Sequence, residues 1–212
     1  MACMAKLGLL GLMLSACTSF PLSYTEFQAR LDRAPYQSQP LSSAWISVPE
    51  AEMVLERRYR AVSEQRILLP NLTAMRGENF ILLQAERSPL SLGGRFRPAD
   101  LLASTQGTPV PFERFEELTF RTSEDVLGLM SWASWTNNAG LNCVLAFRRL
   151  DASSRTVLRG TPAMDMMLRN CLHGSEEEAL APIGPAAVGF AAGPVDPASA
   201  PQMLSPLAGP LP

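Results

Sequence analysis

A short apolar segment that ends in a cysteine, Leu14-Ser15-Ala16-Cys17, sets where the folding part of this chain begins. One basic residue, Lys6, precedes the apolar run, and small residues follow it, which is the layout of a secretory signal. The run is about half of the roughly 20 apolar residues that a membrane-spanning helix needs. We therefore expect residues 1–16 to be a lipoprotein signal peptide that is cleaved, and Cys17 to be the site of lipidation.

An acylated Cys17 would be the contact of this protein with membrane lipid, because two or three acyl chains hold a protein at a bilayer whereas one binds only marginally. Thr18 stands where the inner-membrane retention signal of enterobacteria has aspartate, which favours the outer membrane. We expect a lipid-anchored protein of the cell envelope that faces the periplasm at the outer membrane. A plain secreted protein whose signal contains a cysteine is the alternative.

Cys143 and Cys171 are the cysteines that remain once Cys3 leaves with the signal peptide and Cys17 is acylated. Disulfides form and persist outside the cytoplasm, so the compartment predicts a bridge between Cys143 and Cys171. In the chain-entropy model, a bridge that closes a loop of roughly 29 residues stabilises the fold by about 3 to 4 kcal/mol. Two buried free thiols are the alternative.

The composition of the mature chain changes near both ends. Residues 17–43 are rich in Ser, Gln and Pro, which predicts a flexible tether. Residues 182–212 are mostly Pro, Ala and Gly; such a tail cannot bury enough apolar surface to offset its ordering entropy, so we expect it to be disordered. The remaining residues, 44–181, are enough for a single domain with a sizeable core.

The periodic patterns in this domain predict an α+β fold, mainly an antiparallel β-sheet with a few short helices. The strongest signal is a β-hairpin over residues 127–150, because the Asn- and Gly-containing loop at 136–140 suits the positive backbone torsions of a tight turn. A helix is expected at 98–104, with proline in its first turn, and another from Ser175, which begins a capping box. Further strands are expected at 45–48, 79–85, 155–158 and 164–171, while 52–59 fits a strand or a helix.

Residue types that carry catalysis are sparse. His173, the only histidine, precedes a glycine in an expected turn, so neither a histidine zinc cluster nor a Ser-His-Asp set is indicated. The acidic pairs Glu116-Glu117 and Glu124-Asp125 are typical of a solvated face, although a glycosidase also uses two carboxylates. The sequence therefore predicts no enzyme, no catalytic residue, no metal site and no cofactor. A formal net charge of -2 also argues against nucleic acid as a partner.

Several short segments between residues 47 and 181 occur in a characteristic order. They are Glu56-Arg57-Arg58-Tyr59, the stretch 65–73, Gly77-Glu78-Asn79, and the stretches 143–147, 168–171 and 175–180. In this order they resemble the cellulose biosynthesis protein BcsN family of alphaproteobacterial lipoproteins. The chain departs from that pattern at Arg60 and Arg148, where such proteins tend to have Asn and Gln, and in its long Pro-rich tail.

The resemblance implies a non-enzymatic accessory role in making or exporting cellulose, an exopolysaccharide. Partners would be other subunits of the cellulose synthase complex, and the glucan itself is a candidate ligand. A structural lipoprotein of another envelope assembly, such as a pilus or secretion apparatus, is the second possibility. A periplasmic carbohydrate-active enzyme is the third.

Trp132 and Trp135 are the candidate residues for stacking on glucan, because flat aromatic rings suit the apolar faces of glucose. On a strand, however, residues three apart point to opposite faces, so they share no platform unless a bulge intervenes. Packing in the core is the alternative for each. An arginine cluster fits either an acidic partner or lipid headgroups, or else an exposed strand face balanced by Glu52, Glu56 and Glu64. Its members are Arg57, Arg58 and Arg60, with Arg66 nearby in sequence.

Overall fold

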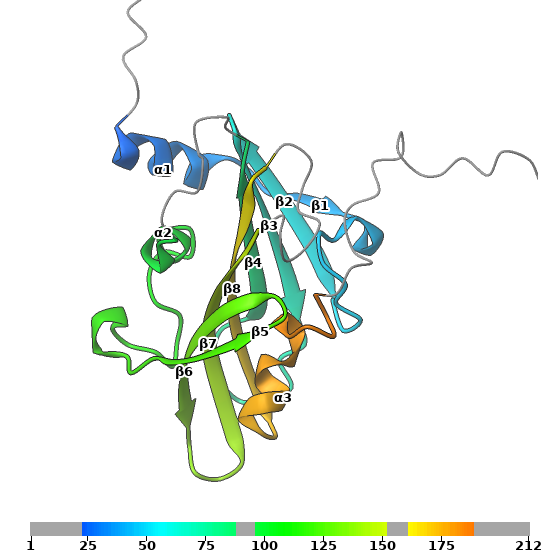
Figure 1. Cartoon of the computed structure of the whole chain (residues 1–212), viewed down its shortest axis with the longest axis vertical. Coiled ribbons are helices and arrows are strands. Elements are labelled where there is room, and N and C mark those ends of the chain that lie inside the picture. The colour runs from blue at the N-terminus through cyan, green and yellow to red at the C-terminus, as the bar shows by residue number, and fades with distance from the viewer. Residues whose placement is uncertain (1–22, 88–95, 152–160, 189–212) are drawn as a thin grey trace, which may run out of the picture.

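The computed structural model describes residues 23–87, 96–151 and 161–188. These residues build one eight-stranded sheet in the order β1-β2-β3-β4-β8-β7-β6-β5, and each neighbouring pair of strands is antiparallel. Strands β1 to β4 follow one another through one half of the sheet and β5 to β8 through the other, so that β4 and β8 meet in the middle (Figure 1). The expected α+β class, with a mainly antiparallel sheet and a few short helices, is confirmed.

The strands are β1 (Gln37–Gln39), β2 (Met53–Tyr59), β3 (Val62–Leu69), β4 (Asn79–Glu86), β5 (Arg121–Asp125), β6 (Gly128–Thr136), β7 (Leu141–Asp151) and β8 (Ala163–His173). The α-helices are α1 (Tyr24–Arg33), α2 (Pro98–Ala103) and α3 (Glu176–Leu180). Three short 3-10 helices are η1 (Leu41–Ser43), η2 (Phe115–Glu117) and η3 (Ala181–Ile183). Within the described ranges, no helix combines the length and the apolar character needed to cross a membrane.

Both faces of the sheet are covered, which makes three layers (Figure 1). On one side, here called the α3 face, Ala179 and Ile183 pack with sheet residues such as Leu168. On the other side, the α2 face, Leu101 and Leu102 of α2 pack with sheet residues such as Phe147 and Met167. Because β7 and β8 are buried on both sides, their sequences are nearly continuous apolar runs rather than alternating ones.

The hairpin expected at 127–150 is confirmed as β6 and β7. Its turn contains Asn138 at φ 57° and Gly140 at φ 88°, the positive torsions that the loop composition predicts. The side chain of Asn137 closes the turn, since its Oδ1 accepts hydrogen bonds from the backbone amides of Ala139 and Leu141.

Four other local expectations are confirmed: β4 covers 79–85, β8 covers 164–171, α2 begins at Pro98, and α3 follows Ser175. The ambiguous segment 52–59 is strand β2. The strand expected at 155–158 lies outside the described residues. The strand expected at 45–48 is wrong: this segment is a loop across the α3 face, and the amide of Trp45 donates to the side-chain oxygen of Gln65 at 2.7 Å instead of to a neighbouring strand.

The tether expected at 17–43 is wrong over its described part, residues 23–43. Ser23 and Glu26 form a capping box at the start of α1, and Leu31 of this helix is fully buried. Strand β1 then pairs with β2. The tail boundary at 182 also shifts, because Ile183 and Val188 are fully buried in the α3-face core. Residues 17–22 and 189–212 of the two expected terminal segments lie outside the described ranges, as does Cys17.

Candidate functional site

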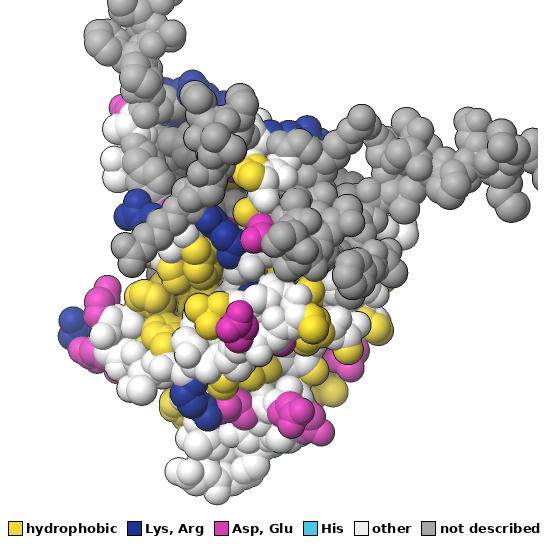
Figure 2. All heavy atoms as spheres, viewed as in Figure 1, with side chains coloured by type: hydrophobic (Ala, Val, Ile, Leu, Met, Phe, Trp, Pro, Cys, Tyr) yellow, Lys and Arg dark blue, Asp and Glu magenta, His cyan; other side chains and the backbone are white. Residues whose placement is uncertain are grey.

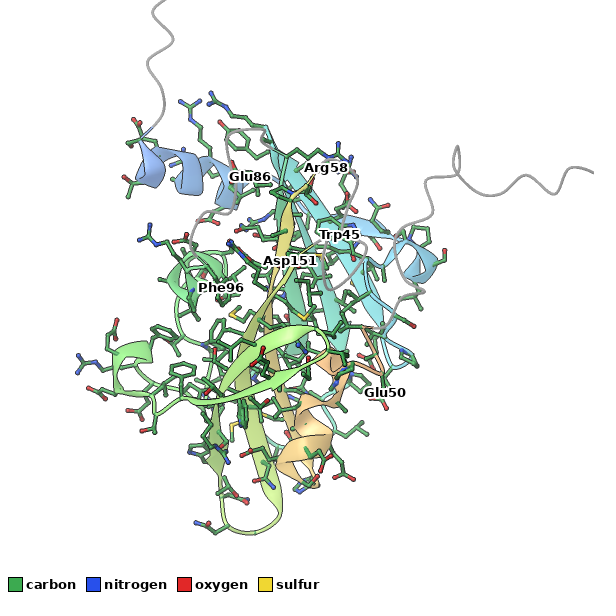
Figure 3. All side chains as sticks on the ribbon, viewed as in Figure 1. Trp45, Glu50, Arg58, Glu86, Phe96 and Asp151 are labelled. Carbon is green, nitrogen blue, oxygen red and sulfur yellow. A yellow bond between two sulfur atoms is a disulfide. The ribbon has the colours of Figure 1, made fainter. Side chains whose placement is uncertain are left out.

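A pocket of about 830 Å³ lies beside the ends of β3 and β8, next to α3 and η3. The loop before β2 contributes residues 47–50, and Figure 3 labels Glu50 on this loop beside η3. The ends of β3 and β8 contribute Leu69 and residues 170–173. Further lining residues come from the β3–β4 loop, from α3 and η3, and from the segment that follows η3: Pro70, Leu72, Thr73, Glu178, Ala181, Pro182, Ala186 and Ala187.

The lining of this pocket is mainly apolar, with a few polar groups at its margin. Leu72 is the most exposed large hydrophobic residue in the described part of the chain, at 91%. Glu50, His173 and Glu178 bring charge or polarity to the same space. A mostly apolar cavity with a small number of placed polar groups is the usual form of a ligand site.

The backbone of β8 has an open edge at this pocket. β4 pairs with β8 only as far as Phe80 opposite Arg169. Beyond that point the side chain of Asn79 replaces the strand, donating to the carbonyl of Cys171 at 2.9 Å and accepting from its amide at 2.8 Å. Because the peptide groups of alternate strand residues point the same way, the N–H and C=O of His173 face this side too, past the end of β4.

The expected disulfide is present, and one of its two residues, Cys171, contributes to the pocket lining. Cys143 and Cys171 stand directly opposite each other on β7 and β8, with Cα atoms 4.0 Å apart, and their sulfur atoms are bonded. Both side chains are buried. Since Asn79 holds the other side of Cys171, the pocket end of β8 is fixed from both sides.

Helix α3 is only five residues long, so it depends on contacts at its ends. The amide of Glu178 donates to Ser175 Oγ at 3.1 Å, and the amide of Ser175 donates to Glu178 Oε2 at 2.7 Å. Asn170 on β8 donates from Nδ2 to the carbonyl of Ala179 at 2.9 Å. A Cβ atom at position 174 would overlap Glu178 Oε2, so a larger residue there would displace the carboxylate that caps the helix. These contacts hold α3 as a wall of the pocket.

Arg169 is a fully buried cation that fastens two loops to β8. Its Nη1 donates to Asn79 Oδ1 at 2.7 Å, its Nε to the carbonyl of Val110 at 3.0 Å, and its Nη2 to the carbonyl of Arg76 at 2.8 Å. Burial lowers the pKa of Arg169 to about 10. The arginine thereby positions Asn79, which in turn holds Cys171.

The two tryptophans lie on opposite faces of β6, as residues three apart on a regular strand do. Trp132 packs on the α3 face, where its Nε1 donates to Glu176 Oε1 at 2.9 Å and the guanidinium of Arg121 lies 5.4 Å from its ring centroid. Trp135 packs against the α2-face core. They form no shared platform, and glucan stacking by either one remains a prediction.

Arg148, on the α3 face of β7, is fully buried and anchors the β5–β6 turn. Its Nη2 and Nη1 donate to the two carboxylate oxygens of Asp125 at 2.6 and 3.2 Å, and Nη1 also donates to the carbonyl of Ile183 at 2.8 Å. Burial alone would raise the pKa of Asp125, but hydrogen bonds from Arg148 and from the Leu127 amide outweigh it, so that the pKa lies below its usual value.

This lowered pKa makes part of the stability dependent on pH. A carboxylate with a folded pKa below its unfolded pKa contributes stability that is fully present above about pH 4 and is lost as the pH falls through the folded pKa. We expect Asp125→Asn to lower the melting temperature at pH 7 and to flatten its decline in acid. Melting curves from pH 7 to 2 test this, with Glu124→Gln on the exposed part of β5 as the matched control. An unchanged acid decline in Asp125→Asn would contradict the assignment.

A row of polar side chains crosses the α2 face from β2 to β7: Arg57, Glu64, Gln84, Asp165 and Arg149 stand opposite one another in register. Glu64 is fully buried, and it accepts hydrogen bonds from Arg57 Nε at 2.7 Å and from the hydroxyl of Tyr36. Burial and then the Glu64 charge raise the pKa of Tyr36 well above its usual range.

This row corrects the interpretation of the arginine cluster. Arg57 belongs neither to an exposed strand face nor to a surface for lipid headgroups, because it is 4% exposed and bound to Glu64. Arg58 does lie on the surface, in an ion pair with Glu56, and Arg66 pairs with Glu78.

Sequence reasoning noticed His173 but not the pocket beside it, since Glu50, Leu72 and Glu178 come from separate segments with no shared motif. Within residues 23–87, 96–151 and 161–188, no three His, Cys, Asp or Glu side chains are grouped closely enough to hold a metal ion.

No family model matches the chain, and neither a curated protein nor a solved structure shows a significant similarity to it.

Proposed function

We propose that this chain is a lipid-anchored, non-enzymatic accessory protein of bacterial cellulose biosynthesis or export. Its anchor would be Cys17, and it would act on the periplasmic side of the outer membrane by binding another subunit of the assembly. The observation that carries the binding role is the pocket of about 830 Å³ beside α3. The resemblance to the BcsN family supports the cellulose assignment.

The walls of the pocket are held in place by a disulfide and hydrogen bonds, which supports a role in binding a partner. One wall is the end of β8, which is held by the disulfide to Cys143 and by the side chain of Asn79. Another wall is α3, which is capped by Ser175 and tied to β8 by Asn170. A site held in place before binding loses less conformational entropy on forming a complex.

The path from the anchor supports a partner in the periplasm. Helix α1 begins at Tyr24, only seven positions after Cys17, and seven residues span at most about 25 Å when fully extended. In Figure 1, α1 lies at one end of the sheet and α3 at the other. An acylated Cys17 would therefore hold the α1 end close to the membrane, with the pocket at the far end.

Acylation tests the anchor. In the bacterium that produces the protein, we expect mass spectrometry of the membrane fraction to find a diacylated or triacylated peptide beginning at Cys17. Cys17→Ser removes the thiol that receives the diacylglyceryl group, so the acyl mass should disappear. The Cys143→Ala/Cys171→Ala variant is the matched control and should retain it. Intact protein in the cytosol, with its leader uncut and no fatty acid, would overturn the proposal.

Co-purification tests the assembly. The tagged lipoprotein, isolated from native membranes in mild detergent without crosslinker, should bring cellulose synthase subunits with it. Pilus or secretion subunits in their place would support the second candidate, a structural lipoprotein of another envelope machine. Turnover of short β-glucans by the purified protein would contradict the non-enzymatic role.

A further inference from the structure

We propose that the pocket beside α3 binds an extended segment of a partner protein that carries apolar side chains and an adjacent Arg or Lys. This proposal names the kind of partner that the proposed function requires. It rests on the proposed function only in taking the partner to be a protein of the same assembly. Three features of the described residues carry the inference: the apolar lining, the open strand edge and the sign of the charges.

The apolar lining of the pocket fits apolar side chains of the partner segment. Val48, Leu69 and Leu172 line the space, and Leu72 stands at its margin with 91% of its surface exposed. Exposed apolar surface at the mouth of a cavity is typical of a binding site, because covering it removes that surface from water. An occupant that inserts aliphatic side chains would satisfy this part of the site.

The edge of β8 beyond Cys171 fits the backbone of an extended peptide. Up to Cys171, the β4 side of β8 is occupied, first by β4 and then by the side chain of Asn79. The N–H and C=O of His173 are the next groups on that side, and an extended chain can donate to one and accept from the other. Addition of a strand at an open sheet edge is a common mode of peptide recognition, in which the backbone supplies hydrogen bonds and alternate side chains enter pockets.

The charges select the kind of peptide. Glu50 and Glu178 line the pocket, and none of its described lining residues is Lys or Arg. Glu177 extends the acidic surface along α3, whereas Glu176 is paired with Arg121; Figure 2 shows acidic side chains gathered over this helix. Such a margin attracts a basic side chain and repels anionic lipid headgroups or a fatty acid carboxylate. The occupant therefore carries an Arg or Lys next to its apolar residues.

A peptide selection tests the inference with the mature protein, which begins at Cys17, in detergent. The probe is a random heptapeptide library displayed on phage, selected on the wild-type protein. We expect the enriched peptides to share apolar residues at alternate positions next to Arg or Lys. Synthetic copies should bind more weakly as salt is raised.

Two variants with matched controls locate the binding site. Leu72→Asp should weaken the selected peptides by about tenfold, whereas Val126→Asp, which changes an 80% exposed side chain on the β5–β6 turn, should leave affinity unchanged. Glu50→Arg should weaken them and should select acidic flanks when the library is screened again. Glu52→Arg, an exposed position outside the pocket lining, is its control. All four positions are at the surface or the pocket margin, so the variants are expected to fold. Their melting temperatures check this.

Three outcomes would overturn the inference. These are a library that yields no enriched peptide, enriched peptides that bind Leu72→Asp as well as wild type, and palmitic acid that competes with them for the pocket. Each outcome is separable from failure of the proposed function. Cellulose synthase subunits that co-purify equally with wild type and Leu72→Asp would place the partner elsewhere on the protein while leaving the accessory role intact.

Discussion

Glu64→Leu is expected to lower the free energy of unfolding by about 3 to 5 kcal/mol, the range observed when one member of a buried ion pair is removed. The side chain of Arg57 is 3% exposed and that of Glu64 is fully buried, so loss of the carboxylate leaves the guanidinium buried without its close partner. Asp32, whose side chain is 40% exposed, remains 3.2 Å from Arg57 and compensates only in part. Urea unfolding followed by circular dichroism measures the loss.

The double variant Arg57→Met/Glu64→Leu separates the cost of an unpaired charge from the cost of altered packing. Replacing both members of a buried pair by apolar residues of similar size is often neutral or stabilising. We therefore expect the double variant to recover most of the stability that Glu64→Leu loses. A loss below about 1 kcal/mol in Glu64→Leu, the upper range for an exposed pair, would show that this pair is exposed to solvent in solution.

Removal of the disulfide is expected to cost about 3 to 4 kcal/mol in the chain-entropy model, because the bridge closes a loop between residues 28 positions apart. Cys143→Ala/Cys171→Ala tests this without placing a hydroxyl in the core. The effect should be largest at the end of β8, so amide hydrogen exchange of residues 170–173 should accelerate more than that of β3. Both measurements use the mature protein, in which Cys17 is proposed to be acylated.

A thiol count provides the independent check on this prediction. If Cys17 is acylated as proposed, denatured mature protein should show no free thiol before reduction and two after it. Two free thiols before reduction would contradict the bridge. Equal stability of the oxidised and reduced wild-type protein would contradict its role in holding β8.

Local chemistry explains which parts of the fold were predictable. Asn138 and Gly140 favour positive torsions whatever surrounds them, and Ser175 caps a helix with groups three residues away. The same logic applies to Ser23 and Glu26, whose capping box begins α1 inside a segment that composition alone assigned to a tether. The missed helix therefore had a local signal, and the Ser-, Gln- and Pro-rich composition around it concealed it.

Buried charges explain why strand β3 was missed. β3 contains Glu64, Gln65 and Arg66 in succession, a polar run that does not resemble a central strand. Its burial is possible because Arg57 pairs with Glu64, and because Gln65 donates to the carbonyl of Ser43 and accepts from the amide of Trp45. None of these partners is adjacent in sequence, so the hydrophobic pattern of β3 alone underestimates its burial.

The amino-acid sequence by itself determined the turns, the helix starts and the antiparallel character of the sheet, because each depends on local backbone preferences and side-chain patterns. Only the tertiary structure decided that β4 meets β8, that Arg57, Arg148 and Arg169 are buried, and that Glu50, Leu72, His173 and Glu178 surround one pocket. The physical reason is separation along the chain: Asn79 and Cys171 are 92 positions apart, and their hydrogen bonds exist only once the two halves of the sheet have joined.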